Sequence, residues 1–186
     1  MNSDSVLEKI IAFADHAHGQ QMRKYSDERY IVHPIRLMKI CRNYSDEIPV
    51  LAAAILHDVL EDTSTGESEI LNFLSDYMSE SQAKETLKLV VELTDVYTKS
   101  DYPHLNRKQR KVLETERLGK ISSTAQTIKY ADIIDNTIEI VAHDRGFAPK
   151  YLKECKAILE AADEGNPKLR EEALEGIKEG FEKLKS

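Results

Sequence analysis

The sequence predicts an all-α protein built as one compact domain. Of its 186 residues, 41% are hydrophobic and 32% are charged, and only 7 are glycine and 5 are proline, which argues against disorder and against a loop-rich β fold. Apolar residues recur at helical spacing along most of the chain, and no segment of useful length alternates as a strand does. Because domains usually hold about 100–200 residues, we expect a single helical core.

Three helices are expected in the amino-terminal third of the chain. Apolar residues at helical spacing from Val6 to Ala14, preceded by possible capping residues at 3–5, predict a first helix of about 14 residues. Pro34 suits the first turn of a helix over residues 35–43 and should keep His33 outside helical geometry, at the mouth of this helix. Residues 50–62 form a third helix whose first half is apolar nearly all round, which is typical of a central helix buried on several sides.

The remaining helices are predicted over residues 68–77, 81–94, 107–118, 123–142, 149–162 and 167–184. Residues 20–32 and 97–105 are expected to be loops with charged and aromatic side chains, and such loops on a rigid scaffold commonly carry binding groups. The segment 163–186 is strongly charged and weakly amphipathic. We expect it to form a peripheral helix of the same domain as residues 1–162.

Targeting and cysteine patterns favour a cytoplasmic protein without a membrane partner. The amino terminus lacks the basic start and apolar run of a signal peptide, and no stretch approaches the roughly 18 apolar residues that span a membrane. Cys41 and Cys155 lie far apart without C-x-x-C spacing, so buried thiols are expected rather than a disulfide framework or a zinc site. The oligomeric state stays open, a homo-oligomer included.

The net charge of -7 argues against nucleic acid as a partner, because nucleic-acid binding needs a broad basic surface. A small anionic ligand is compatible with it, since a local basic cluster can dominate the field inside a cleft. Residues 106–111 form such a cluster. A charge run of this kind is either a solvated helix face or a substrate contact, and both alternatives stay open.

The most specific local signal is the run His-Asp-Val-Leu-Glu-Asp at residues 57–62. Glu61 stands four residues after His57, and Asp62 four after Asp58, so on a helix these side chains would share one patch. The three carboxylates would repel one another there, whereas a divalent cation would remove the repulsion. The alternative is a polar helix end exposed to water.

A second His-Asp pair, at residues 143–144, illustrates that alternative, because no acidic turn follows it and we expect a helix terminus there. The first pair differs in having partners. His33 supplies a second imidazole, and Asp132, with Asn136 one turn later, supplies a carboxylate from an otherwise apolar helix. Two imidazoles and two carboxylates suit Mn, Fe, Co, Ni or Zn and leave positions for water and substrate.

Five separated motifs coincide with the pattern of a known family. They are Ala17-His18-x-x-Gln21-x-Arg23-Lys24, Tyr30-Ile31-x-His33-Pro34, Leu51-Ala52-Ala53-Ala54-x-Leu56-His57-Asp58-x-x-Glu61-Asp62-Thr63, Glu92-Leu93-Thr94 and Lys129-x-Ala131-Asp132-x-x-x-Asn136. In this order the chain resembles the HD-domain hydrolases of the RelA/SpoT type, especially small stand-alone alarmone hydrolases of the metazoan SpoT-homologue kind. The resemblance covers about residues 12–160.

The resemblance implies a fold, a site and an activity. The implied fold is a single all-α HD-domain bundle with a metal site at its centre. The family's metal ligands fall on His33, His57, Asp58 and Asp132, and its catalytic acidic pair falls on Glu61 and Asp62. Its nucleotide-contacting residues fall on Arg23, Lys24 and Asn136, and further on Lys99, Arg107 and Tyr151. The implied reaction is Mn²⁺-dependent removal of the 3′-pyrophosphate from guanosine tetra- or pentaphosphate, a small nucleotide substrate, with one divalent ion as the cofactor.

In the expected mechanism the ion lowers the pKa of a bound water, and Glu61 and Asp62 orient this water or move its proton during attack on phosphorus. Arg23 could stack on the base, while Lys24 and the basic residues within 99–111 neutralise phosphates. We expect His18 to support other residues rather than to touch substrate.

Three stretches depart from the family's pattern. Gln20 stands where glycine is usual, residues 27–30 read Asp-Glu-Arg-Tyr where Gly-x-Pro-Tyr is usual, and residues 131–136 read Ala-Asp-Ile-Ile-Asp-Asn where Ala-Asp-Arg-Leu-His-Asn is common. A nucleotidase or dinucleotide phosphate hydrolase is therefore an alternative, because a fold does not fix its substrate. A non-catalytic nucleotide sensor is another, although such a protein has no need of the acidic pair.

Overall fold

The computed structural model describes residues 3–185, and within that range the regular structure is helical. Its one β feature in the described range is an isolated bridge between Met22 and Arg29. The predicted all-α class is confirmed. Contacts group the chain into two compact units, an amino-terminal unit (1–94) and a carboxyl-terminal unit (95–186), which are described separately. The division into residues 1–162 and 163–186 stays a prediction.

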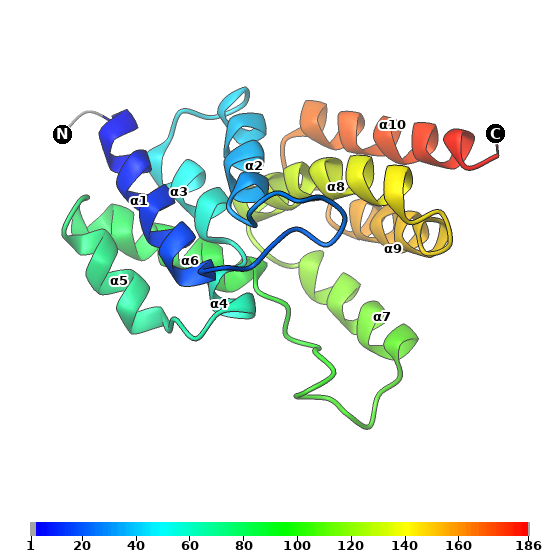
Figure 1. Ribbon diagram of the computed structural model, residues 1–186, viewed down its shortest axis with the longest axis horizontal. Helices are drawn as coiled ribbons and strands as arrows, with labels where there is room; N and C mark the ends of the chain where they lie inside the picture. Colours follow the sequence, from blue (N-terminus) through cyan, green and yellow to red (C-terminus); the bar gives the residue numbers. More distant parts are fainter. Residues whose placement is uncertain (1–2, 186) are drawn as a thin grey trace. The chain divides into compact units, whose positions relative to one another are not determined.

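The amino-terminal unit is arranged around one apolar helix (Figure 1). Its helices are α1 (Ser3–His18), α2 (Val32–Arg42), α3 (Ile48–Leu56), α4 (Val59–Asp62), α5 (Glu67–Ser75) and α6 (Glu80–Leu93). Helix α3 is buried from Pro49 to Leu56 and packs against α1, α2 and α6. An apolar surface on every side requires neighbours on every side. The predicted central helix is thus confirmed.

Two details of this unit differ from the prediction. His33 lies inside α2, because the chain enters the helix through a turn at residues 29–31 and Pro34 occupies the first turn, where its missing N–H removes no hydrogen bond. The helix expected over residues 50–62 is broken at His57 and Asp58, which link α3 to α4. Asp58, at φ -98° and ψ -2°, tilts the chain there.

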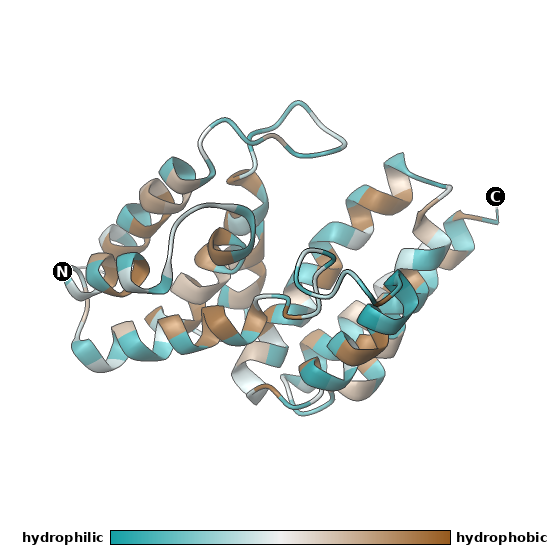
Figure 2. Ribbon diagram, turned by 90° about the horizontal axis from the view of Figure 1, so that it is seen from below, coloured by the Kyte–Doolittle hydropathy of each residue, from teal (hydrophilic) through white to brown (hydrophobic). Residues whose placement is uncertain are grey.

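The carboxyl-terminal unit contains α7 (Arg107–Leu118), α8 (Ser123–His143), α9 (Ala148–Ala161) and α10 (Pro167–Lys183). Helix α8 packs against α9 and α10, and α7 packs against α9. Apolar residues recur among polar ones along these helices, as expected of helices that bury one face (Figure 2). The approach to α10 is tight, because a Cβ on Gly165 would lie 2.5 Å from the ring of Tyr130. Cys41 and Cys155, one in each unit, are buried thiols, as predicted.

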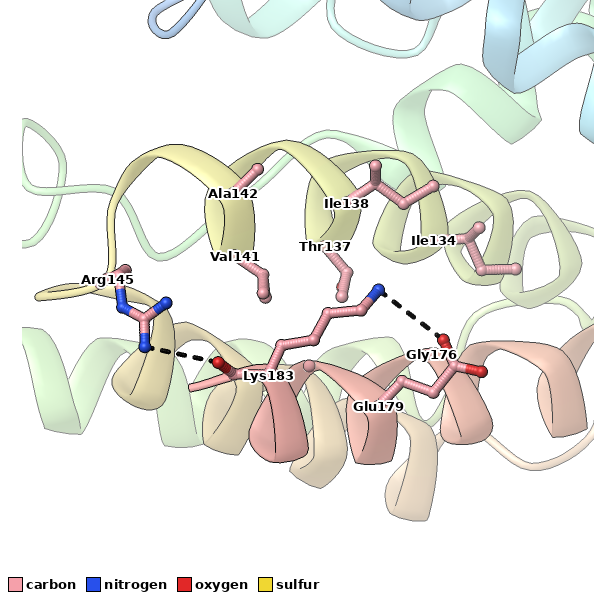
Figure 3. Close-up of a pocket in the computed structure, with 10 residues that line it drawn as sticks. Ile134, Thr137, Ile138, Val141, Ala142, Arg145, Gly176, Glu179 and Lys183 are labelled. Atoms are coloured by element: carbon pink, nitrogen blue, oxygen red, sulfur yellow. Dashed lines mark hydrogen bonds and ion pairs between the residues drawn. The ribbon is translucent and has the colours of Figure 1, made fainter. Parts of the chain in front are cut away.

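A surface pocket of about 560 Å³ lies between α8 and α10 (Figure 3). Apolar side chains of α8 line one wall, and Gly176 and Gly180 leave room on the other. Arg145 closes one end by donating hydrogen bonds to the carbonyl oxygens of Lys183 and Leu184. None of the predicted site residues lines this pocket. In the part of the chain that the structure describes, no helix is both long enough and apolar enough to traverse a bilayer.

Candidate active site

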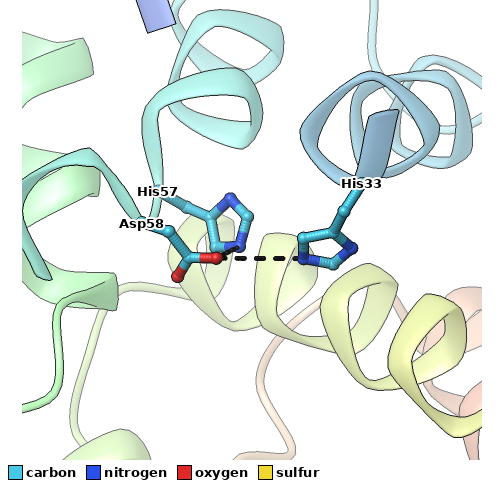
Figure 4. A group of neighbouring side chains, drawn as sticks. All are labelled: His33, His57 and Asp58. Carbon is cyan, nitrogen blue, oxygen red and sulfur yellow. Dashed lines mark ion pairs between the residues drawn. The ribbon is translucent and has the colours of Figure 1, made fainter. Parts of the chain in front are cut away.

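Three of the predicted metal ligands gather in the amino-terminal unit (Figure 4). One ligand atom from each of His33, His57 and Asp58 lies within 4.8 Å of the other two. Oδ2 of Asp58 is 2.8 Å from Nε2 of His57 and 3.9 Å from Nε2 of His33. The two imidazoles are almost fully buried, with 0% and 4% of His33 and His57 exposed. Helix α2 supplies the first residue, and the break between α3 and α4 supplies the other two.

The tautomer of His57 suits a metal ligand. Its Nδ1 lies 3.0 Å from the carbonyl oxygen of Ala54, which can only accept, so Nδ1 carries the proton. In the neutral ring the lone pair is then on Nε2 and faces a carboxylate oxygen of Asp58, which is also electron-rich. A divalent cation accepts from both atoms and removes their repulsion. The donor set therefore fits the implied ion.

Tyr30 orients the cluster, and the sequence reasoning gave it no role. Its hydroxyl donates a hydrogen bond to Oδ2 of Asp58. Its ring meets that of His33 edge-on, with centroids 5.9 Å apart, and the ring of His18 at 4.5 Å. A tyrosine just before a buried helix needs a partner for its polar tip, which is the signal that could have identified it.

The two predicted catalytic acids lie on α4, directly after the ligand pair. Glu61 and Asp62 are exposed, whereas His33 and His57 are buried. The N–H of Asp62 donates to the carbonyl of Asp58 at 2.8 Å, so the helical turn fixes the acids relative to the ligand. Two buried imidazoles that could bind a metal are thus followed, one helical turn after His57 and Asp58, by two carboxylates that are exposed to water.

The first loop carries the two predicted substrate contacts of this unit. The guanidinium of Arg23 lies 5.6 Å from the centre of the Tyr30 ring, next to the phenol that holds Asp58. Lys24 donates to the hydroxyl of Tyr25 at 2.7 Å. The loop is closed by the hydrogen bond from the N–H of Arg23 to the carbonyl of Glu28. Both cations therefore extend from a constrained turn.

Asp132 and Asn136 lie on α8, in the carboxyl-terminal unit. Asp132 is buried, with 7% exposed. It accepts from Lys129 Nζ at 2.8 Å and from Asn136 Nδ2 at 2.6 Å. These bonds hold the carboxylate in one orientation. The roles of Asp132 as a ligand and of Asn136 as a substrate contact stay predictions.

The other predicted contacts of this unit differ in setting. Lys99 is exposed in a loop whose start is held by Glu114, which accepts from two backbone N–H groups at 3.1 Å. Arg107 forms two hydrogen bonds with Glu154, at 2.7 and 3.2 Å. Burial raises the pKa of the Tyr151 hydroxyl well above its usual range, and the neighbouring Cys155 adds to this. Tyr151 is therefore a neutral hydrogen-bonding group at physiological pH.

The second His-Asp pair ends α8, as predicted. Asp144 follows the last residue of α8, and its Oδ1 accepts from the N–H of Phe147 at 3.0 Å. This carboxylate caps a turn.

A family model for the HD domain matches residues 30–137, a range that holds the whole cluster of His33, His57 and Asp58. The chain belongs to the HD-domain family. Mouse MESH1, a guanosine-3′,5′-bis(diphosphate) 3′-pyrophosphohydrolase, is 37% identical over 128 residues, which are 67% of this chain and 63% of the relative. MESH1 of Xenopus tropicalis is 35% identical over 141 residues, 73% of this chain and 70% of the relative. The match thus spans less than two thirds of the mouse protein's length.

A solved structure supports the same relationship. It is that of a metazoan ortholog of SpoT that hydrolyses ppGpp, and it superposes with a TM-score of 0.77 and 25% identity over 94% of this chain and 95% of that one. The resemblance predicted for this HD domain is confirmed.

Proposed function

We propose that this HD domain is a metal-dependent pyrophosphohydrolase that removes the 3′-pyrophosphate from guanosine tetra- or pentaphosphate, with Mn²⁺ as the ion. The observation that carries the proposal is the cluster of His33, His57 and Asp58 with two solvent-facing carboxylates one turn further along the chain. The named activities of its relatives supply the substrate.

The buried residues are proposed to bind the ion, and the exposed acids to act on the attacking water. His33, His57 and Asp58, with Asp132, would hold the ion, which when bound supplies positive charge for phosphoryl oxygens and a water of lowered pKa. Glu61 and Asp62 orient the attacking water and accept its proton. The water oxygen forms a bond to the phosphorus next to the 3′ oxygen, and the water's proton passes to one of these two acids. The bond between that phosphorus and the 3′ oxygen breaks, the 3′ oxygen takes up this proton and becomes a hydroxyl, and pyrophosphate leaves whole.

The nucleotide is held by the cationic and polar side chains. Arg23 stacks on the base as a planar cation, and Lys24 neutralises phosphate. Lys99, Arg107, Asn136 and Tyr151 are proposed as further contacts. The net charge of -7 disfavours a polyanion in general, so these local cations must outweigh the surrounding field.

The test is the release of pyrophosphate and of orthophosphate from a nucleotide panel with Mn²⁺ and with other divalent ions. Pyrophosphate and a guanosine 5′-phosphate product from guanosine tetraphosphate are expected. Orthophosphate alone, or cleavage of simple monophosphates with the tetraphosphate untouched, would favour the nucleotidase alternative. Binding without turnover would favour a sensor.

A further inference from the structure

Gln21 connects the end of α1 to the acidic turn of α4. Its side-chain amide lies 2.8 Å from Nδ1 of His18 through Oε1 and 2.9 Å from Oδ2 of Asp62 through Nε2. A carboxylate can only accept, so the NH₂ group must face Asp62 and the oxygen must face His18. Nδ1 of His18 is therefore the donor. The three side chains form one directed chain of hydrogen bonds.

The backbone of Gln21 is fixed on both sides. Its N–H donates to the carbonyl of His18 at 3.0 Å, and its carbonyl accepts from the N–H of Tyr30 at 2.9 Å. Gly19, at φ 57°, makes the turn that brings Gln21 back over the helix end. Because the backbone is already fixed, only the side-chain rotamers of Gln21 have to be ordered when it bridges its two partners.

The far end of the chain is also anchored. His18 is 7% exposed and packs on the ring of Tyr30. Its Nε2 is buried without a hydrogen-bond partner among the described residues, so within that range the hydrogen bond to Gln21 and the packing on Tyr30 together fix the rotation of the imidazole. Asp62, by contrast, is exposed and stands at the end of a four-residue helix. Among the described residues, Gln21 is the side chain that holds this carboxylate by a hydrogen bond.

We infer that Gln21 is a positioning residue for the reaction: it transmits the orientation of the buried His18 to the carboxylate of Asp62. This inference rests on the proposed function, in which Asp62 handles the attacking water. Gln21 engages Oδ2 of Asp62, and the carboxylate has a second oxygen, Oδ1, that can accept a hydrogen bond from the water.

The experiment compares Gln21→Ala and Gln21→Glu with Gln20→Glu, a matched control that makes the same charge change at the exposed neighbouring residue. In the Mn²⁺-loaded full chain, loss of a hydrogen bond to a charged group should lower kcat about 10-fold in Gln21→Ala, with KM changed less than about 2-fold. Gln21→Glu places a carboxylate against Asp62, and its kcat should fall further than that of Gln21→Ala. Gln20→Glu should have the kcat and KM of the wild type.

A double-mutant cycle separates positioning from a general structural effect. If Gln21 acts through Asp62, then Gln21→Ala should change kcat by less than about 2-fold in an Asp62→Asn background. Fully additive effects of the two substitutions on kcat, or a rise in KM with kcat unchanged, would overturn the inference. Turnover by the wild-type protein would in that case leave the proposed function standing. Matching thermal unfolding midpoints for the variants and the wild type exclude misfolding.

An NMR readout keeps the inference testable if the wild type proves inactive on the nucleotide panel, which would refute the proposed function alone. In the full chain with a diamagnetic divalent ion, the side-chain amide signals of Gln21 should shift on Asp62→Asn and not on Asp76→Asn, an exposed acid of the same unit. Unchanged Gln21 signals in Asp62→Asn would show that the contact does not form, and the inference would be wrong.

Discussion

The phenol of Tyr30 donates its hydrogen bond to Asp58 through Oδ2, the same oxygen that lies 2.8 Å from Nε2 of His57. One carboxylate oxygen therefore meets a fixed donor on one side and a ligand-type nitrogen on the other. Partners of this kind commonly change metal affinity by about 10–100-fold when removed.

Tyr30→Phe should weaken divalent-ion affinity by about 10-fold, because the ring contacts remain while the donor to Asp58 is lost. Calorimetric titration of Mn²⁺ measures this. Tyr77→Phe removes a hydroxyl from a ring that packs on Phe73 in the same unit and is the control. Equal affinities in Tyr30→Phe and the wild type would show that the phenol does not orient a ligand.

His57→Ala and Asp58→Ala should each abolish metal retention and turnover, since each removes one of only a few ligands. Elemental analysis of protein equilibrated with Mn²⁺, followed by desalting, measures the first effect. His143→Ala, in the second His-Asp pair, should keep both properties. Full activity in either of the first two variants would refute the site assignment.

Glu61→Gln and Asp62→Asn should retain the ion and lose about 10²-fold or more in rate, the usual scale for a positioned acid or base. Metal content and kcat, measured on one preparation, separate binding from chemistry. Glu69→Gln makes the same kind of change at an exposed acid on α5. Wild-type rates in the first pair would make those residues ordinary exposed helix-end acids.

Neutralising Arg107 and Lys108 together should raise KM for guanosine tetraphosphate, more at low salt than at high salt, because screening weakens the same attraction. Arg107 is paired with Glu154, so part of any effect could come from the loss of that contact between α7 and α9. Glu154→Gln removes the pair and keeps both cations, and it serves as the control. If the double variant had the same KM as the wild type at low and at high salt, residues 106–111 would be a solvated helix face.

Stability should fall in alkaline solution, and Cys155 should account for part of the fall. Burial raises the pKa of its thiol to about 12 from 9.0, so between these values the unfolded chain loses a proton that the folded chain keeps. The contribution of this thiol to the free energy of unfolding is fully present below about pH 9 and is lost as the pH rises towards 12. Urea unfolding at a series of pH values should show a shallower decline in Cys155→Ala. Identical pH slopes would contradict the assignment.

Helix positions followed from the sequence where local signals were strong. Helix α7 begins after Asn106 as expected, and the structure shows the reason, a capping box in which Asn106 and Gln109 satisfy each other's backbone N–H groups. The break at His57 was missed because the apolar pattern continues into the fully buried Val59, and no glycine or proline interrupts it. Periodicity reports which face is buried, and it does not report a small tilt between successive turns.

The residues of the candidate cluster were predictable, and the contacts that support them less so. The residue types and the His-Asp-x-x-Glu-Asp spacing single out His57 and Asp58 as candidate ligands, and the structure brings both together with His33. Their role as ligands stays a prediction. The bridge from Gln21 to Asp62 joins residues 41 positions apart, through a loop whose path depends on tertiary contacts. Neither spacing nor composition carries information on such a contact.

The break between α3 and α4 also bears on how this sequence can change in length. Each residue added to a helix rotates all later residues of that helix by about 100°. One residue inserted between Leu56 and Val59 would therefore rotate α4, with Glu61 and Asp62, relative to α3, and one residue deleted there would remove His57 or Asp58. The link between α4 and α5 carries no such constraint, so we expect natural insertions and deletions to accumulate after Asp62 and to be absent at the break.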